Sequence, residues 1–289
     1  MPKQSELLKG LLAKPAAKQP VIDVITRQLM TMQHEVFKGT VNLWDQRAED
    51  LKLIIAECEA DLKLFAERKE RSKKWEDKGE VKSPRFPPSG AGDCVRKLWF
   101  RHFDAPTDPV PLSDTLSGHF IREVGTQMHL LVQLLLAKAG VIVEREARIK
   151  TKPPLPTISG FCDGLLDIDG PLGFELKTIS DDRLRQAGGK PLGHHLQQVR
   201  LYQAVHKMPF SLLYLTRNTC RLEEHIIPYD GRATALELIK PRRFQRCVER
   251  KLLPKREGDN LAKAPCRWCS FTAICNGGMK LKEFVDGLK

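Results

Sequence analysis

The 289-residue sequence lacks a long apolar run and lacks an apolar segment near its N-terminus. The longest apolar stretch, near Leu130–Ala137, falls short of the roughly 20 residues that a membrane-spanning helix needs. No hydrophobic signal segment follows Met1-Pro-Lys-Gln-Ser. These absences exclude a membrane-spanning class of protein, and we expect a cytoplasmic protein with no membrane partner.

The cysteines do not follow the pattern of a disulfide framework, because thiols of cytosolic proteins stay reduced and spaced cysteines there indicate metal. Three of the eight form Cys266-Arg-Trp-Cys269-Ser-Phe-Thr-Ala-Ile-Cys275, and Cys94 stands far upstream. Four thiolates suit zinc or an iron–sulfur cluster on their chemistry alone. The others lack ligand spacing, and we expect them to serve packing: Cys58, Cys162, Cys220 and Cys247.

Positive charge is in surplus over negative charge. The formal net charge is +12, of which residues 1–85 contribute +3 and the rest +9. A basic surplus of this size favours a polyanionic partner such as DNA, although it also aids solubility. The length allows about two domains.

Residues 1–80 predict an all-α, coiled-coil-like extension. Apolar residues recur at alternating spacings of four and three from Phe37 to Phe65, which is a heptad seam. The seam suits a homo-oligomer or a fold back onto the rest of the chain. Residues 81–92 are rich in proline and glycine and predict a linker.

Residues 93–289 predict an α/β domain with a mixed sheet flanked by helices. We expect helices over Thr115–Lys138, Leu192–Val205 and Gly231–Leu252. We expect five strands, over Val141–Lys150, Thr157–Asp167, Gly173–Ile179, Phe210–Thr216 and Arg221–Ile227.

The hairpin over residues 159–178 carries the candidate chemistry. Alternation places Glu175 and Lys177 on one face of the second strand, and Asp163 of the first strand can meet them. Two adjacent carboxylates favour a hard cation between them, such as Mg²⁺ or Mn²⁺. Three solvated charges on an exposed hairpin face are the plain alternative.

Two helices carry further candidates. Gly125 lies four residues before His129 and permits close helix packing, so His129 becomes a metal ligand if that neighbour is the hairpin. Gln198 and Tyr202 lie one turn apart on the next long helix. Either pair, taken alone, is also typical of ordinary core or surface residues.

Six motifs in this order resemble the RecB-like branch of the PD-(D/E)xK nuclease superfamily, over roughly residues 89–279. They are Cys94, Gly125-x-x-x-His129, Gly160-x-x-Asp163, Glu175-x-Lys177, Gln198-x-x-x-Tyr202 and the C-terminal cysteine group. The chain looks most like its iron–sulfur members, the CRISPR-associated RecB-like exonucleases and the AddB-type nucleases. It departs from them in lacking a helicase motor and in residues 1–85. The resemblance implies a restriction-endonuclease-like sheet.

The resemblance also implies roles for single residues. The divalent metals would be bound by His129, Asp163, Glu175 and the backbone carbonyl of Leu176. Asp163, Glu175 and Lys177 would be catalytic, with Lys177 activating water and with Gln198 and Tyr202 positioning the substrate. A 4Fe–4S cluster, with Zn²⁺ as the alternative, would be held by Cys94, Cys266, Cys269 and Cys275.

We therefore expect a Mg²⁺- or Mn²⁺-dependent DNA exonuclease that acts on single strands or duplex ends, in a bacterial, archaeal or virus-infected cell. The alternative is a DNA-end-binding or assembly protein that recruits partners through its N-terminal helices. Four arginines on one helix are candidate phosphate contacts, or else favour the helix dipole: Arg242, Arg243, Arg246 and Arg250.

Overall fold

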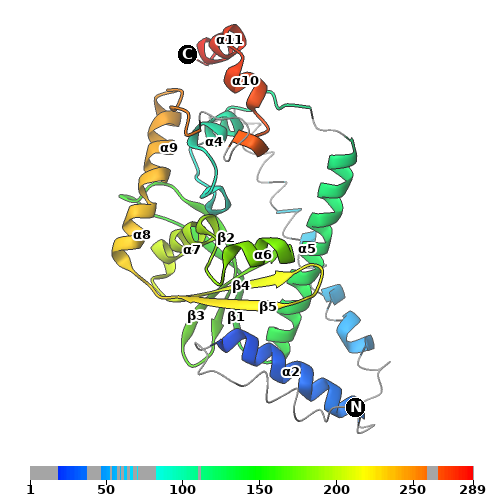
Figure 1. The fold of residues 1–289 in the computed structure, drawn as a ribbon. Coiled ribbons are helices and arrows are strands. Elements are labelled where there is room, and N and C mark those ends of the chain that lie inside the picture. The colour runs from blue at the N-terminus through cyan, green and yellow to red at the C-terminus, as the bar shows by residue number, and fades with distance from the viewer. Residues whose placement is uncertain are drawn as a thin grey trace.

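A mixed five-stranded sheet with helices on both faces forms the centre of the molecule (Figure 1). This architecture confirms the α/β class and the mixed sheet that the sequence predicts. The computed structural model describes residues 19–37, 47–52, 54–56, 59, 62–63, 66–67, 70, 83–109, 112–258 and 266–288. Within these residues, every helix is too short or too polar to cross a bilayer.

The strands lie in chain order across the sheet, and all neighbours are antiparallel except β3 and β4, which are parallel. Their bounds are β1 Ile142–Lys150, β2 Ser159–Asp167, β3 Pro171–Ile179, β4 Phe210–Thr216 and β5 Leu222–Ile227. All five expected strands are confirmed, with small shifts at their ends. The parallel pair requires a crossover, and α6 and α7 supply it.

The crossover begins with α6, Asp181–Ala187, a short helix that the sequence analysis missed. Its ends carry ordinary signals: Ser180 accepts a hydrogen bond from the Arg183 backbone at the start, and Gly188 takes a left-handed conformation after the end. The longer helix α7, Gly193–His206, then crosses one face of the sheet and returns the chain to β4.

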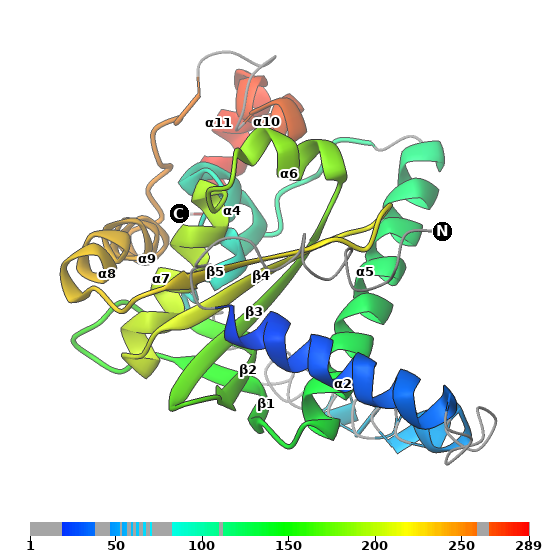
Figure 2. The same cartoon turned by 60° about the horizontal axis from the view of Figure 1, so that its bottom comes forward.

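Two separate cores lie on the two faces of the sheet. One contains buried residues of α7 and of α4, Val95–His102, against β1, β2 and β4. The other contains buried residues of α2, Pro20–Phe37, and of α5, Leu112–Lys138, against β3 and β4 (Figure 2). A cluster at the sheet can therefore receive side chains from α5 on one side and α7 on the other.

The helix expected over Gly231–Leu252 is two helices, α8 Gly231–Glu237 and α9 Ile239–Glu249. The break at Leu238 has a clear cause. Pro241 lacks a backbone N–H and its ring clashes with the carbonyl one turn earlier, so a continuous helix cannot pass through it. The expectation of one helix was wrong for that reason.

The N-terminal extension is described in part. Residues 20–37 are helical, as expected, and α2 packs on the sheet through Val21, Val24 and Ile25. Described heptad positions are exposed, with Leu51 at 43% and Ile55 at 56%. Other members of the seam, such as Val41, Trp44 and Phe65, lie outside the described residues, and the coiled coil and the homo-oligomer stay predictions.

The predicted linker touches the fold at a definite place. Phe86 is 1% exposed and forms a bridge to Ile158 beside β2, and the 3-10 helix Pro88–Gly90 packs on Gly160. The domain boundary itself stays a prediction.

At the C-terminal end, a 3-10 helix at Cys266–Trp268 and two short helices, α10 Thr272–Asn276 and α11 Met279–Asp286, follow α9.

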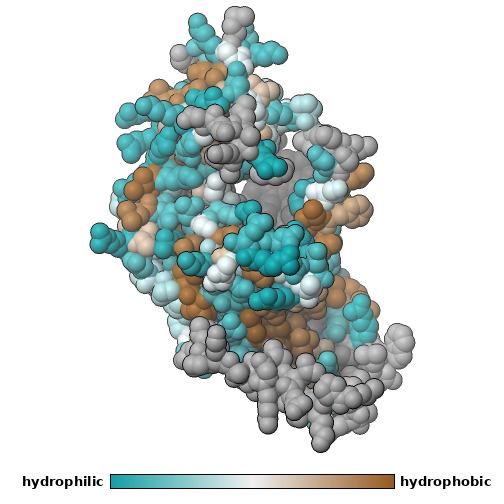
Figure 3. Space-filling view, viewed as in Figure 1, coloured by the Kyte–Doolittle hydropathy of each residue, from teal (hydrophilic) through white to brown (hydrophobic). Residues whose placement is uncertain are grey.

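Helix α5 is longer than the sheet is wide, and its N-terminal half leaves hydrophobic side chains on the surface, at the right of Figure 3. Leu116 is 51% exposed and Phe120 is 66% exposed. The C-terminal half of the same helix is buried against β3, so α5 changes from a surface helix to a core helix as it reaches the sheet.

Candidate active site

The site lies where β2 and β3 stop pairing. The ladder between them runs from the pair Asp167 and Pro171 to the pair Gly164 and Phe174. At the next position the carboxylate of Asp163 takes over, because its Oδ2 accepts a hydrogen bond of 2.6 Å from the backbone N–H of Leu176. One carboxylate thus occupies the gap between two strands.

Alternation along β3 separates its side chains as the sequence predicts. Phe174 and Leu176 are buried in the core that α2 and α5 cover. Glu175 and Lys177 point toward α7, and Lys177 Nζ lies 2.6 Å from Glu175 Oε1. The expected meeting of both carboxylates and the lysine is therefore present.

Helix α7 brings Gln198 and Tyr202 to the same carboxylate. Gln198 Nε2 donates to Glu175 Oε1 at 2.8 Å, and the Tyr202 hydroxyl donates to it at 3.2 Å. Gln198 also contacts the Tyr202 hydroxyl. Glu175 Oε1 therefore has three partners, whereas Glu175 Oε2 is buried and has no hydrogen-bond partner among the described residues.

Helix α5 reaches the site from the other side of the sheet. His129 Nδ1 lies 3.4 Å from Asp163 Oδ2. One turn earlier, a Cβ atom at Gly125 would lie only 3.0 Å from Thr178 Oγ1 of β3, so glycine permits this close approach. The hairpin is thus the neighbour of Gly125, which is the condition under which the sequence predicts His129 as a metal ligand.

Sequence reasoning missed Gln133, whose side chain holds the backbone of Asp163 in place. Its Nε2 donates to the Asp163 backbone carbonyl at 3.0 Å, and its Oε1 accepts from Arg145 Nη2 of β1 at 2.8 Å. Gln133 is 6% exposed. The only signal was its position four residues after His129, on the same helix face.

The surroundings of Glu175 disfavour the charged form of its carboxyl group. Burial and the neighbouring charge of Asp163 raise the pKa of Glu175 to about 7. Burial acts to lower the pKa of Lys177, but the carboxylate of Glu175 outweighs burial and raises it. Burial and Glu175 also raise the pKa of Tyr202 well above its usual range, so its hydroxyl remains a donor.

His129 is also influenced by its carboxylate partner. Burial acts to lower the pKa of His129, but the hydrogen bond to Asp163 and its charge together raise it. In the described part of the chain, no three His, Cys, Asp or Glu side chains already converge on one point as a metal group. Oxygen donors, an imidazole and the unpartnered Glu175 Oε2 nevertheless suit a divalent cation.

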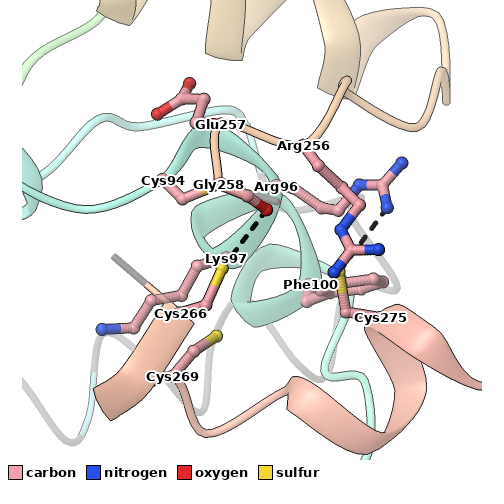
Figure 4. Close-up of a pocket in the computed structure, with 10 residues that line it drawn as sticks. All are labelled: Cys94, Arg96, Lys97, Phe100, Arg256, Glu257, Gly258, Cys266, Cys269 and Cys275. Carbon is pink, nitrogen blue, oxygen red and sulfur yellow. Dashed lines mark hydrogen bonds between the residues drawn. The ribbon is translucent and has the colours of Figure 1, made fainter. Parts of the chain in front are cut away.

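A second polar cluster lies at the far end of the fold. A small pocket, about 20 Å³ in volume, is lined by all four predicted cluster cysteines: Cys94, Cys266, Cys269 and Cys275 (Figure 4). All four are free thiols. Cys94 immediately precedes α4 and the other three cysteines come from the last stretch of the chain, so the pocket joins the two ends of residues 93–289.

Basic side chains surround these thiols. Arg96, Lys97 and Arg256 line the same pocket, and Arg96 Nη1 donates to Cys275 Sγ at 3.5 Å (Figure 4). Burial raises the pKa of Cys269, and the nearby Cys275 and Cys94 raise it further, whereas Lys97 lowers it. Thiols that repel each other as anions beside cationic groups suit a bound metal centre.

The four arginines of α9 do not share one environment. Arg243 Nη1 lies 3.3 Å from Glu257 Oε1, beside the cysteine pocket. Arg242 and Arg246 line an open cavity of about 350 Å³ against the loop at Pro154–Pro156. Arg250 is exposed at the C-terminal end of the helix.

Comparisons with known proteins give likenesses of fold. No protein-family model matches the chain, and no curated protein sequence matches it. The crystal structure of SSO0001 is 20% identical, with 71% of this chain and 93% of that chain covered and a TM-score of 0.45.

An alkaline exonuclease from Laribacter hongkongensis, LHK-Exo, is also similar. It is 13% identical, with 59% of this chain and 90% of that chain covered and a TM-score of 0.43. Its complex with dAMP gives the same values.

Proposed function

We propose that the chain is a metal-dependent DNA exonuclease of the PD-(D/E)xK superfamily, RecB-like in its order of motifs. One observation carries the proposal. Glu175 is 3% exposed, stands beside Asp163, and leaves Oε2 buried without a hydrogen-bond partner in the part of the chain that the structure describes. A buried carboxylate oxygen of this kind is unfavourable unless a cation completes it.

The side chains divide the work of phosphodiester hydrolysis. His129, Asp163, Glu175 and the Leu176 carbonyl would hold Mg²⁺ or Mn²⁺, which supplies a hydroxide-like water and neutralises phosphate charge when bound. Lys177 lies on the same face as Glu175 and would orient the attacking water or a phosphate oxygen.

Gln198 and Tyr202 act through Glu175. Their hydrogen bonds to Oε1 fix the carboxylate, which would leave Oε2 available to a cation. Gln133 does the same for Asp163 through the backbone carbonyl. Groups held in place before the substrate arrives need no rearrangement during the reaction, which favours catalysis.

DNA as the substrate rests on charge as well as on the site. The net charge of +12 favours a polyanion, and Arg242 and Arg246 line an open cavity suited to phosphates. Arg250 is exposed and is also proposed to contact DNA phosphates, whereas Arg243 forms an ion pair with Glu257. A cytoplasmic location and an oligomer formed by residues 1–80 remain proposals.

The cysteine pocket favours a 4Fe–4S cluster over zinc. A single Zn²⁺ with Zn–S bonds of about 2.3 Å would need sulfurs about 3.8 Å apart. The described cysteines line a pocket together but do not converge on one point. A polynuclear cluster accepts more widely spaced thiolates, and its role would be to join the ends of the domain.

The alternative function is a DNA-end-binding or assembly protein on the same fold. The hydrogen-bonded set around Glu175 argues against it, because DNA binding alone needs no buried carboxylate held by a lysine, an amide and a phenol. Both hypotheses predict DNA binding, so cleavage is the quantity that distinguishes them.

The test uses end-labelled single-stranded and duplex DNA with anaerobically purified full-length protein, in Mn²⁺ or Mg²⁺ and in EDTA. We expect metal-dependent shortening from an end in the wild type and none in Asp163→Ala. Circular DNA of the same sequence should resist, because it has no end. DNA binding without cleavage in any metal would support the assembly protein instead.

A further inference from the structure

Two adjacent histidines in the first turn of α7 differ in how the fold uses them. His195 Nδ1 lies 3.1 Å from the Tyr214 hydroxyl, which also accepts a hydrogen bond from the Leu192 backbone N–H. The ring of His194 lies against that of His195, with centroids 4.1 Å apart. His194 is exposed, and in the part of the chain that the structure describes neither of its ring nitrogens has a hydrogen-bond partner.

The helix period places His194 in the row of α7 side chains that faces the candidate site. Residues four apart lie on one face of a helix, so His194 is followed in this row by Gln198 and Tyr202. Both of those side chains donate a hydrogen bond to Glu175 Oε1. His194 therefore extends the row beyond the two residues already assigned to the site.

The sheet places Lys177 at the same level as the first turn of α7. Tyr214 of β4 is the direct neighbour of Lys177 in β3, and Tyr214 is also the residue that His195 contacts. A Cβ atom at Gly92 would lie 2.6 Å from the His194 Cβ atom, so the chain just before α4 packs directly against His194. His194 thus lies at the end of the site that Lys177 occupies.

Positive charge around His194 exceeds negative charge. Partial burial lowers the pKa of His194, and the charges of Arg183 and Lys177 lower it further, whereas Asp93 raises it. Asp93 is already paired with Lys97 at 2.7 Å. The guanidinium of Arg183, on α6, is exposed and has no hydrogen-bond or ion-pair partner among the described residues. An anion is the ligand that such a surface favours.

We propose that Arg183 and His194 form a phosphate-binding subsite, which holds the backbone phosphate next to the scissile one in the substrate strand. The inference rests on the proposed nuclease function and specifies how its substrate is held. An imidazole N–H and a guanidinium both donate to phosphate oxygens, and neither contact reads the identity of a base.

The position on α7 separates this phosphate from the scissile one. Gln198 contacts Glu175, the carboxylate proposed to bind the metal. His194 lies four residues earlier, about 6 Å along the helix. A strand whose scissile phosphate lies at Glu175 would therefore present its neighbouring phosphate to His194. Contacts at that phosphate would fix the register of the strand, which favours reaction by holding the reacting groups in place.

The test removes the charge of one substrate phosphate at a time. Single-stranded oligonucleotides carry one uncharged methylphosphonate at a defined linkage, and kcat/KM in Mn²⁺ is measured for cleavage at the linkage beside it. For the wild type we expect a loss of about tenfold at one adjacent position, as for one hydrogen bond to a charged group. His194→Ala and Arg183→Gln should each lose about tenfold on the unmodified strand and little more on the modified strand.

Arg185→Gln is the matched control, because Arg185 lies on the same helix as Arg183 but is paired with Asp182. This variant should cleave both substrates like the wild type. Binding of the unmodified strand in EDTA gives a second readout. The slope of log Kd against log salt should be shallower by about 0.7 in Arg183→Gln, the value for one phosphate contact on a single strand, and unchanged in Arg185→Gln.

A full further loss on the modified strand in His194→Ala and Arg183→Gln, both folded by circular dichroism, would overturn the subsite while leaving the nuclease intact. An unchanged kcat/KM of both variants on the unmodified strand would do the same. A failure of the proposed function looks different, because the wild type itself would cleave no DNA. In that case the subsite falls with it.

Discussion

Two buried glutamates on this sheet differ in how completely the described protein groups partner their oxygens, and only Glu175 is proposed to bind a metal. Glu224 on β5 is 7% exposed and Glu175 on β3 is 3% exposed, and burial raises the pKa of both. Glu224 has both oxygens partnered: Oε1 accepts from the Val21 N–H and the Ser211 hydroxyl, and Oε2 accepts from the Ile22 N–H.

Glu175 is bonded on one side only. Three donors converge on Oε1, and Oε2 has none from the residues that the structure describes. Glu224 binds the first turn of α2, where a negative charge is favourable, and so attaches the N-terminal helix to the sheet. Burial therefore does not distinguish the two glutamates, whereas the unpartnered oxygen beside Asp163 supports the proposal that Glu175 binds a metal.

The largest expected effect comes from removing the charge of Glu175 while keeping its shape. Glu175→Gln should lower cleavage by about 10³-fold or more, because a metal ligand supplies several kcal/mol of transition-state stabilisation. Gln198 and Tyr202 can still donate to the amide oxygen, so the fold should persist. Glu224→Gln is the matched control in the same DNA cleavage assay, and an equal loss of activity there would break the comparison.

The cysteine pocket extends the comparison to side chains whose proposed partner, a metal centre, would link distant segments of the chain. Cys94→Ser should remove the iron or zinc and lower the free energy of unfolding by about 4–5 kcal/mol, as expected for loss of a link that closes a loop of more than a hundred residues. Metal content, visible absorbance and thermal unfolding measure this. Cys220→Ser, at an exposed thiol, should change none of them.

Substitution of Gln133 tests whether metal binding depends on the side chain that orients Asp163 as well as on the carboxylates themselves. Gln133→Leu should weaken Mn²⁺ binding by about 10- to 100-fold, the usual effect of removing a residue that orients a ligand. Gln127→Leu, at an exposed position on the same helix, supplies the control. If both variants bind Mn²⁺ like the wild type, Asp163 does not depend on Gln133.

Glu224 should give the smallest effect, and on stability only. Glu224→Ala leaves buried N–H groups of α2 without partners and should destabilise the fold by about 1–3 kcal/mol, with the cleavage rate of the folded protein unchanged. Denaturant unfolding measures the loss.

The pH dependence of that loss has a definite sign. Because the folded protein raises the pKa of Glu224, the folded state takes up a proton before the unfolded chain does as the pH falls. Its contribution to stability therefore grows from neutral pH toward the ordinary range of a glutamate and is smallest at high pH. A difference between wild type and variant that shrinks as the pH falls would contradict this.

Much of the candidate site could be predicted because it follows short periodicities. Asp163, Glu175 and Lys177 are placed by alternation along two strands, and Gln198 with Tyr202 by one helical turn. The packing of α5 could be anticipated from Gly125, although which element it meets could not.

The rest depends on tertiary contacts or on overlooked local chemistry. Gln133 and Arg145 belong to different elements, and no local pattern joins them. The break between α8 and α9 could have been foreseen from Pro241, and α6 from Ser180 and Gly188. Arg243 looked like its neighbours on α9, and only its pairing with Glu257 separates it from them.

Calorimetric titration of Mn²⁺ into metal-free wild type and into Glu175→Gln tests the central claim most directly. The account predicts binding to the wild type, with proton release where Glu175 and His129 are displaced from their protonated forms, and binding at least about tenfold weaker in the variant. Equal Mn²⁺ affinity in the two proteins, or none in either, would contradict a metal site in the gap between β2 and β3.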